Sequence, residues 1–209
     1  MSGDDWFRNK TWNPRIEKAF FEKLSRARSQ RDQYLAIQAI EIAPHKPKTA
    51  LKLIDHYFET RKNDFDYVRV LMAKVDAQMA LNNEVEAISV YKEILEREAE
   101  FPNTKTNAYV DYPYLVATRK YEDEYDSALE ILETRKDDLV WPVSRFKWHA
   151  SYALILFHRG NNSKAKEHAV LATESARAKR SPFRYHRGLG LVGKEHKPVV
   201  KLLIRMATE

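Results

Sequence analysis

Residues 85–95 read VEAISVYKEIL, and the spacing of their apolar side chains decides the fold class. Val85, Ile88, Tyr91, Ile94 and Leu95 recur every three or four positions, which places them on one face of an α-helix. A strand would instead alternate apolar and polar residues with a period of two. The stretch therefore predicts a helix that buries one face.

Similar spacings run along the chain between helix start and stop signals. Asn13 followed by Pro14 is typical of a helix start, Asp64 is expected to cap a later helix, and Asn83 with Glu86 resembles a capping box. Only five glycines occur and none lies in residues 4–159, which is a poor supply for β-hairpin turns. We expect about ten helices, near residues 14–28, 32–43, from 47 onward, 64–81, from 83 onward, 105–121, 124–137, 142–159, 162–180 and from 198 onward.

An alanine recurs in similar surroundings and reveals a repeat. It stands in TALKL (Ala50), EAISV (Ala87), SALEI (Ala128) and KAKEH (Ala165), at intervals of 37, 41 and 37 residues. Each lies early in the second helix of an expected pair, where a small side chain lets two helices approach closely. We therefore expect these alanines to be buried between paired helices. Since one amphipathic pair cannot bury its own apolar face, such pairs stack on their neighbours.

The residues around these alanines resemble the tetratricopeptide (TPR) repeat, a helix–turn–helix unit. The resemblance covers roughly residues 31–180, with a spacing longer than the usual 34 residues. The copy at 148–172 carries the pattern in Tyr152, Ala153, Leu156, Gly160, Ala165, Ala169 and Ala172. The resemblance implies an all-α fold, a right-handed α-solenoid of about four TPR-like helix pairs with N- and C-terminal capping helices.

The chain is expected to form one α-helical repeat domain over residues 1–209. Its parts are an N-terminal cap (1–30), the TPR-like repeats (31–180), and a basic loop with a C-terminal helix (181–209). The cap contains DDWFRNKTW at residues 4–12, where three large aromatic side chains precede the first helix. Such a segment either docks on the first helices as a cap or acts as a hook for a partner.

Charge is distributed unevenly along the chain. The net charge is +6, yet residues 84–138 hold 7 Lys or Arg against 15 Asp or Glu, and residues 177–209 hold 9 against 2. Opposed patches of this kind suit charged partners, or a homo-oligomer with a set orientation. The sequence has no cysteine, no apolar N-terminal run, and no apolar run near the ~18 residues of a membrane span. We therefore expect a cytoplasmic protein without a membrane partner.

Motifs for catalysis, metal binding or cofactor binding are weak. GLGLVG at residues 188–193 matches the G-x-G-x-x-G spacing of dinucleotide sites, but helices rather than strands are expected on both sides of it. The seven histidines show no H-E-x-x-H or i, i+4 pair, and no G-x-S-x-G or phosphate-binding loop occurs. We therefore expect no cofactor, no metal and no enzymatic activity.

These features favour a non-catalytic adaptor or scaffold that binds a peptide or a partner protein. The TPR resemblance implies a concave groove lined by the first helix of each pair. Lysines at matching positions make this groove suitable for an acidic peptide or a C-terminal carboxylate. The candidate partner-binding residues are Arg69, Lys74, Tyr114, Lys120, Lys147 and Ser151, with Ala73 and Ala77 beside them.

The alternative function is binding of RNA or single-stranded nucleic acid through the basic aromatic C-terminal region. Arg184, Tyr185 and Arg187 lie within FRYHR at residues 183–187. Aromatic rings stack on bases, and arginines pair with phosphates. A loop that folds back over the last helix pair explains the same residues without a ligand.

Overall fold

A computed structural model of the chain describes residues 5–136 and 139–208. Over these residues the chain contains ten α-helices, short 3₁₀ turns and no strand, which confirms the all-α prediction. The chain divides into two compact units, Met1–Thr106 and Asn107–Glu209. The single domain expected from the sequence stays a prediction, and part of its expected cap, residues 1–4, lies outside the described residues.

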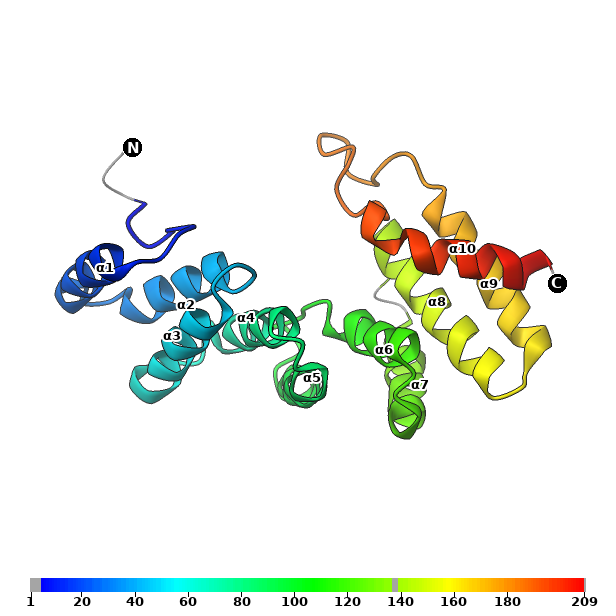
Figure 1. The fold of residues 1–209 in the computed structure, drawn as a ribbon, viewed down its shortest axis with the longest axis horizontal. Helices are drawn as coiled ribbons and strands as arrows, with labels where there is room; N and C mark the ends of the chain where they lie inside the picture. The colour runs from blue at the N-terminus through cyan, green and yellow to red at the C-terminus, as the bar shows by residue number, and fades with distance from the viewer. Residues whose placement is uncertain (1–4, 137–138, 209) are drawn as a thin grey trace. The chain divides into compact units, whose positions relative to one another are not determined.

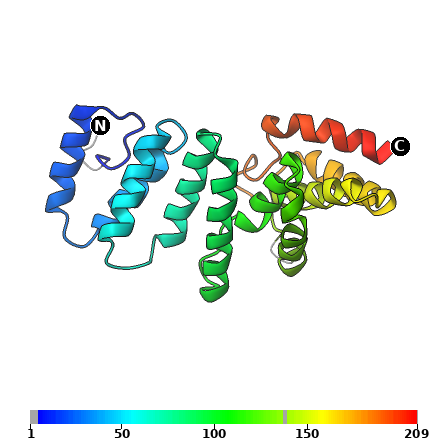
Figure 2. The ribbon, with the colours of Figure 1, turned by 60° about the horizontal axis from the view of Figure 1, so that its bottom comes forward.

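The N-terminal unit is a row of five helices, each packed on its neighbours (Figures 1 and 2). They are α1 (Pro14–Arg26), α2 (Arg31–Ile42), α3 (Pro47–Thr60), α4 (Tyr67–Ala80) and α5 (Glu84–Glu100). The main contacts join α2 to α3 and α4 to α5, and α4 also packs on both α2 and α3. This is the pairing expected from the repeat, with α2 and α4 as first helices and α3 and α5 as second helices.

The C-terminal unit contains the other five α-helices. They are α6 (Ala108–Arg119), α7 (Tyr125–Thr134), α8 (Pro142–His158), α9 (Asn162–Ala176) and α10 (Lys197–Thr208), with 3₁₀ turns η1 (Glu122–Glu124) and η3 (Lys194–His196). The pairs are α6 with α7 and α8 with α9, and the first helices α6 and α8 also pack on each other. The last helix, α10, runs across the α8–α9 pair (Figure 1).

The four recurrent alanines are buried, as predicted. Ala50, Ala87 and Ala128 are 0% exposed and Ala165 is 1% exposed, in α3, α5, α7 and α9. A larger side chain at any of them would push the helix away from its neighbours. The alanine register therefore marks the helix–helix contacts correctly.

The predicted buried face of α5 is right except at its start. Ile88, Tyr91, Ile94 and Leu95 are buried, but Val85 is 71% exposed. The prediction for Val85 was wrong because the buried face of α5 is centred on the line through Ala87, Tyr91 and Ile94. Val85, in the first turn, lies on the opposite face of the helix, which is exposed.

Helix starts follow the sequence signals in part. The side chain of Asn13 accepts a hydrogen bond from Ile16 N (3.0 Å), with Pro14 in the first turn of α1, as predicted. Asp64 does not cap α4, whose N-cap residue is Asp66. Asp64 instead accepts from Arg61 Nε (2.9 Å) and Arg97 Nη2 (2.6 Å). The side chain of Asn83 makes no capping bond at α5 and donates to Gln78 Oε1 (3.0 Å), so the predicted capping box is absent.

Candidate interaction surfaces

The segment before α1, residues 5–13, contains a turn at Trp6 and Phe7 and lies against the first helix α2. Gln38 of α2, fully buried, accepts from Asn9 N (3.0 Å) and donates from Nε2 to Asn9 O (2.8 Å). The Asn9 side chain adds a third bond to Gln38 Oε1 (2.8 Å). One side-chain amide therefore satisfies both backbone groups of a residue outside any helix, as an amide side chain can do for a peptide.

Aromatic side chains fix the same segment in place. Trp6 lies against Phe20 and Tyr34, with ring centroids 5.4 and 4.9 Å away, and Phe7 lies 4.5 Å from Tyr34. Trp12 contacts Phe20 at 5.5 Å. Trp6, Phe7 and Trp12 are all partly buried against the core of the N-terminal unit. The segment is thus docked in the manner of the expected cap.

Two candidate partner-binding residues lie on α4. Arg69 is exposed, with 52% of its side chain accessible, and donates from Nη1 to the buried carboxylate of Asp66 (2.6 Å). Lys74 is half-buried one and a half turns further along. Ala73 and Ala77, expected beside them on the groove, lie instead in the core. Small residues here let α4 approach its neighbours, so the face that α4 offers to a partner is narrower than expected.

The candidates on α6 and α8 are engaged by the chain itself. Lys147 Nζ pairs with Asp111 Oδ1 at 2.6 Å, which joins α8 to α6. The Tyr114 hydroxyl is 3.0 Å from Nδ1 of His196, which belongs to the turn η3. Ser151 is fully buried and donates to Lys147 O (2.7 Å). These three residues therefore stabilise the C-terminal unit, and Ser151 has no surface to offer a partner.

The electrostatics of this cluster keep Tyr114 and His196 neutral. Burial raises the pKa of the Tyr114 phenol, and the Glu195 carboxylate adds to this shift. Burial, with the nearby Lys147 ammonium, lowers the pKa of His196 despite Glu195 and Asp111. His196 Nε2 faces Glu195 Oε1 at 3.5 Å. A proton on Nε2 would leave Nδ1 to accept from the Tyr114 hydroxyl.

The remaining candidates are exposed. Lys120 lies just after α6, in the left-handed conformation at φ 60°. Arg184, Tyr185 and Arg187 lie in the segment between α9 and η3, and Tyr185 is 84% exposed. Phe183 of that segment stacks on Trp141, with ring centroids 4.7 Å apart and planes 13° apart.

The GLGLVG stretch packs against the start of α8 in place of forming a dinucleotide loop. Gly190 has φ +72°, and its O accepts from Val143 N (2.8 Å). A Cβ at Gly190 would lie 2.3 Å from Trp141 Cε3, so no other residue fits without movement. This glycine is required by the close approach to an indole ring.

Sequence reasoning missed a histidine pair between α8 and α9. His149 Nδ1 and His168 Nδ1 are 3.1 Å apart, and the Tyr152 ring stacks on His168 at 4.6 Å. Burial and the neighbouring His168 lower the pKa of His149 to about 4, and burial also lowers the pKa of His168. One imidazole must donate and the other accept, so the contact requires at least one neutral ring. The two histidines lie on different helices that face each other, and their spacing in the sequence does not reveal this contact.

No set of three or more His, Cys, Asp or Glu side chains is arranged to hold a metal ion within residues 5–136 and 139–208. In the same described residues, no helix has the length and apolar character needed to cross a membrane. Comparison with models of protein families, with curated proteins and with solved structures gives no match for this chain. Function must therefore be argued from the surfaces themselves.

Proposed function

We propose that this chain is a non-catalytic interaction module, a right-handed solenoid of TPR-like helix pairs that binds an extended acidic segment of a partner protein. The binding surface is the part of the first helices that the N-terminal unit leaves open, where α4 carries Arg69 and Lys74 about 140° apart around its axis. Such a module would act as an adaptor or scaffold, because it would bind a partner without catalysing a reaction.

The observation that carries this proposal is the contact between Gln38 and Asn9. It supports a first-helix face that holds non-helical chain, because the Gln38 amide pairs with the N–H and C=O of Asn9 and with the amide of its side chain. Trp6 and Phe7, which precede Asn9, and Trp12, which follows it, pack against the core of the N-terminal unit. On the adjacent helix α4, a partner segment would instead meet two cations, Arg69 and Lys74.

Charge favours an acidic segment on α4. The guanidinium of Arg69 has one nitrogen on Asp66 and keeps other donors on its exposed side. Lys74 lies five residues further along α4 and about 140° around its axis, so it would meet a different part of the segment from Arg69. Charges at the edge of a binding surface mainly raise the rate of association and make that rate depend on salt concentration.

Selection of binding peptides from a random library displayed on phage, with the full chain as bait, tests this proposal. We expect enriched peptides to be acidic and to bind the Arg69→Glu/Lys74→Glu variant at least about tenfold more weakly than wild type. The Arg184→Ala/Arg187→Ala variant is the matched control and should bind them normally. Selected peptides that keep full affinity for the α4 variant would overturn the proposal. Lys147 is left unchanged because its pair with Asp111 holds α8 to α6.

A further inference from the structure

The segment from the end of α9 through α10 is an exposed array of cations. Residues 177–208 contain nine Lys or Arg and a single acidic residue, Glu195. All nine basic side chains are exposed, and within the described residues none of them forms an ion pair. They are Arg177, Lys179, Arg180, Arg184, Arg187, Lys194, Lys197, Lys201 and Arg205. Cations without carboxylate partners raise the local concentration of a polyanion and release its counterions when it binds.

The first part of this segment, the loop 179–190, is held in a defined shape. Ser181 N donates to Arg187 O (2.9 Å), which closes the loop on itself. Phe183 stacks on Trp141, and the Gly190 carbonyl is tied to Val143 N at the start of α8. Because the loop is anchored at these points, less conformational entropy is lost when its arginines order on a ligand.

An aromatic side chain on this loop has no role in the core. Tyr185 is 84% exposed, with the Arg184 guanidinium carbon 5.6 Å from its ring centroid. The neighbouring Phe183 keeps 48% of its surface exposed while it stacks on Trp141. Alternating arginines and open aromatic rings offer both a charge for a phosphate and a flat surface for a base.

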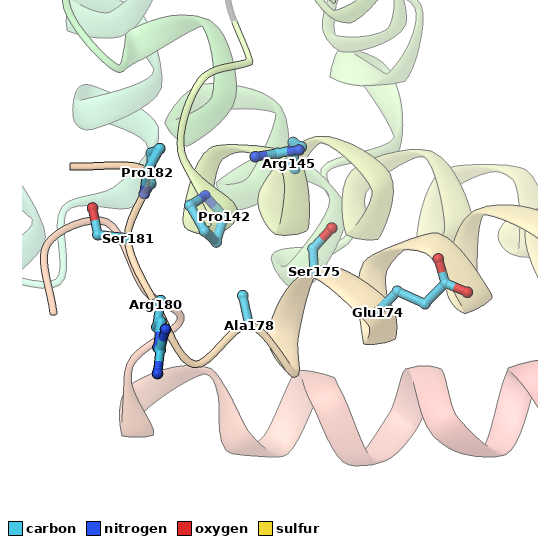
Figure 3. Close-up of a pocket in the computed structure, with 8 residues that line it drawn as sticks. All are labelled: Pro142, Arg145, Glu174, Ser175, Ala178, Arg180, Ser181 and Pro182. Atoms are coloured by element: carbon cyan, nitrogen blue, oxygen red, sulfur yellow. The ribbon is translucent and has the colours of Figure 1, made fainter. Parts of the chain in front are cut away.

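A hollow of about 440 Å³ lies beside the base of the loop (Figure 3). Arg145 of α8 and Arg180 of the loop line it together with small and polar residues. Glu174, the acidic residue among the described residues that line it, lies at the opposite end from Arg180 in Figure 3. The hollow is therefore basic on the side from which the loop arginines continue.

We propose that the loop 179–190, with Arg145, is a binding site for single-stranded nucleic acid. The phosphates contact Arg145, Arg180, Arg184 and Arg187, and an unstacked base lies on the ring of Tyr185. A single strand supplies both phosphates for the arginines and an unstacked base for the ring of Tyr185. An acidic peptide would meet the charges but would leave the exposed ring of Tyr185 unused, so it is the weaker fit.

The test measures fluorescence anisotropy of labelled single-stranded RNA and DNA oligonucleotides of about ten nucleotides with the full chain, over a range of salt concentrations. Tyr185→Ala removes no charge and no buried contact. We expect it to weaken binding about tenfold, since stacking of one base contributes this much. Arg184→Ala/Arg187→Ala should flatten the slope of log K against log salt by about 1.4, from two single-strand phosphate contacts at about 0.7 each.

The matched control is Arg15→Ala/Arg28→Ala, two exposed arginines of the N-terminal unit with the same loss of charge. It should keep the wild-type salt slope and nearly the wild-type affinity. Tighter binding of RNA than of DNA would identify a contact to the 2′-hydroxyl, and equal binding would show that only phosphates and bases are read. Absence of binding at low salt would overturn the proposal. A second pair of results would also overturn it: polyglutamate displaces the oligonucleotide, and Tyr185→Ala leaves the affinity for the oligonucleotide unchanged.

Discussion

Gln38 and Asn9, 29 residues apart, are joined by three hydrogen bonds through a single side-chain amide. Because Gln38 is 0% exposed, water cannot replace these bonds when the amide is removed. The contact ties the N-terminal segment to α2 and is the clearest sign that a first-helix face of this protein holds non-helical chain.

Replacing Gln38 by Met keeps the volume but leaves both backbone groups of Asn9 unpaired. We expect a loss of about 2–4 kcal/mol in the free energy of unfolding, from two buried groups without partners. Urea denaturation followed by circular dichroism measures it. Gln33→Met, a half-exposed glutamine on the same helix, is the control and should stay within about 0.5 kcal/mol of wild type. Equal stability of the two variants would show that the segment is not fastened by this amide.

Replacing Ala165 by Leu tests the repeat register. Ala165 is 1% exposed in the contact between α8 and α9, so the larger side chain should overpack it and cost about 1–3 kcal/mol. The midpoint of thermal unfolding should fall accordingly. Lys166→Leu, on the exposed side of the same helix, should leave the midpoint almost unchanged. A normal midpoint for Ala165→Leu would contradict the register.

Much of the fold could be predicted because helices are determined locally. The helix start at Asn13-Pro14 depends on neighbours within a few residues, and the buried alanines were predicted from their repeat along the chain; both predictions were correct. The predicted start of α4 was wrong because the Asp64 carboxylate binds a distant partner, Arg97 of α5, which no local sequence pattern shows.

The candidate site was harder to predict because its residues depend on contacts between distant segments. Tyr114 and His196 lie 82 residues apart, so the sequence could not show that η3 covers the first-helix position at Tyr114. The pairing of His149 with His168 depends on how α8 and α9 pack against each other. Exposure of Tyr185 and its arginine neighbours was predictable from composition, but the stacking of Phe183 on Trp141 was not.

The histidine pair predicts a dependence of stability on pH. Folding lowers the pKa of His149 from about 6.5 to about 4, and it also lowers the pKa values of His168 and His196. The unfolded chain therefore binds more protons in this window, and the free energy of unfolding should fall as the pH falls below about 6.5.

Removing one imidazole should reduce that dependence. Each proton difference contributes up to about 1.4 kcal/mol per pH unit, so His149→Phe should flatten the slope by up to about that amount between about pH 6.5 and 4, the range between the two pKa values of His149. The groups facing the pair, Arg145, Glu133, Glu167 and Lys164, remain in the variant. Ala165→Leu, destabilised without loss of an imidazole, should keep the wild-type slope. An unchanged slope in His149→Phe would show that this histidine does not titrate on unfolding.

Three glycines give a graded test of the loop geometry. Gly190→Ala should cost about 2–4 kcal/mol, because φ is +72° and the new Cβ would meet Trp141 at 2.3 Å. Gly160→Ala, at φ +79° in open space, should cost only about 1–2 kcal/mol from its backbone conformation. Gly188→Ala has neither constraint and should be nearly neutral. Equal effects at Gly190 and Gly160, measured by urea unfolding, would contradict the docking of the loop on Trp141.

We claim that a partner segment binds on the first-helix face of the N-terminal unit, and photo-crosslinking shows which surface such a segment contacts. A photoreactive amino acid is placed in turn at position 74 on α4, at position 96 on the exposed side of α5, and at position 185 on the loop. Each full-length chain is irradiated with the same selected acidic peptide. We predict crosslinks from position 74 and none from position 96 or 185. Crosslinks from position 96 or 185, with none from position 74, would contradict the claim.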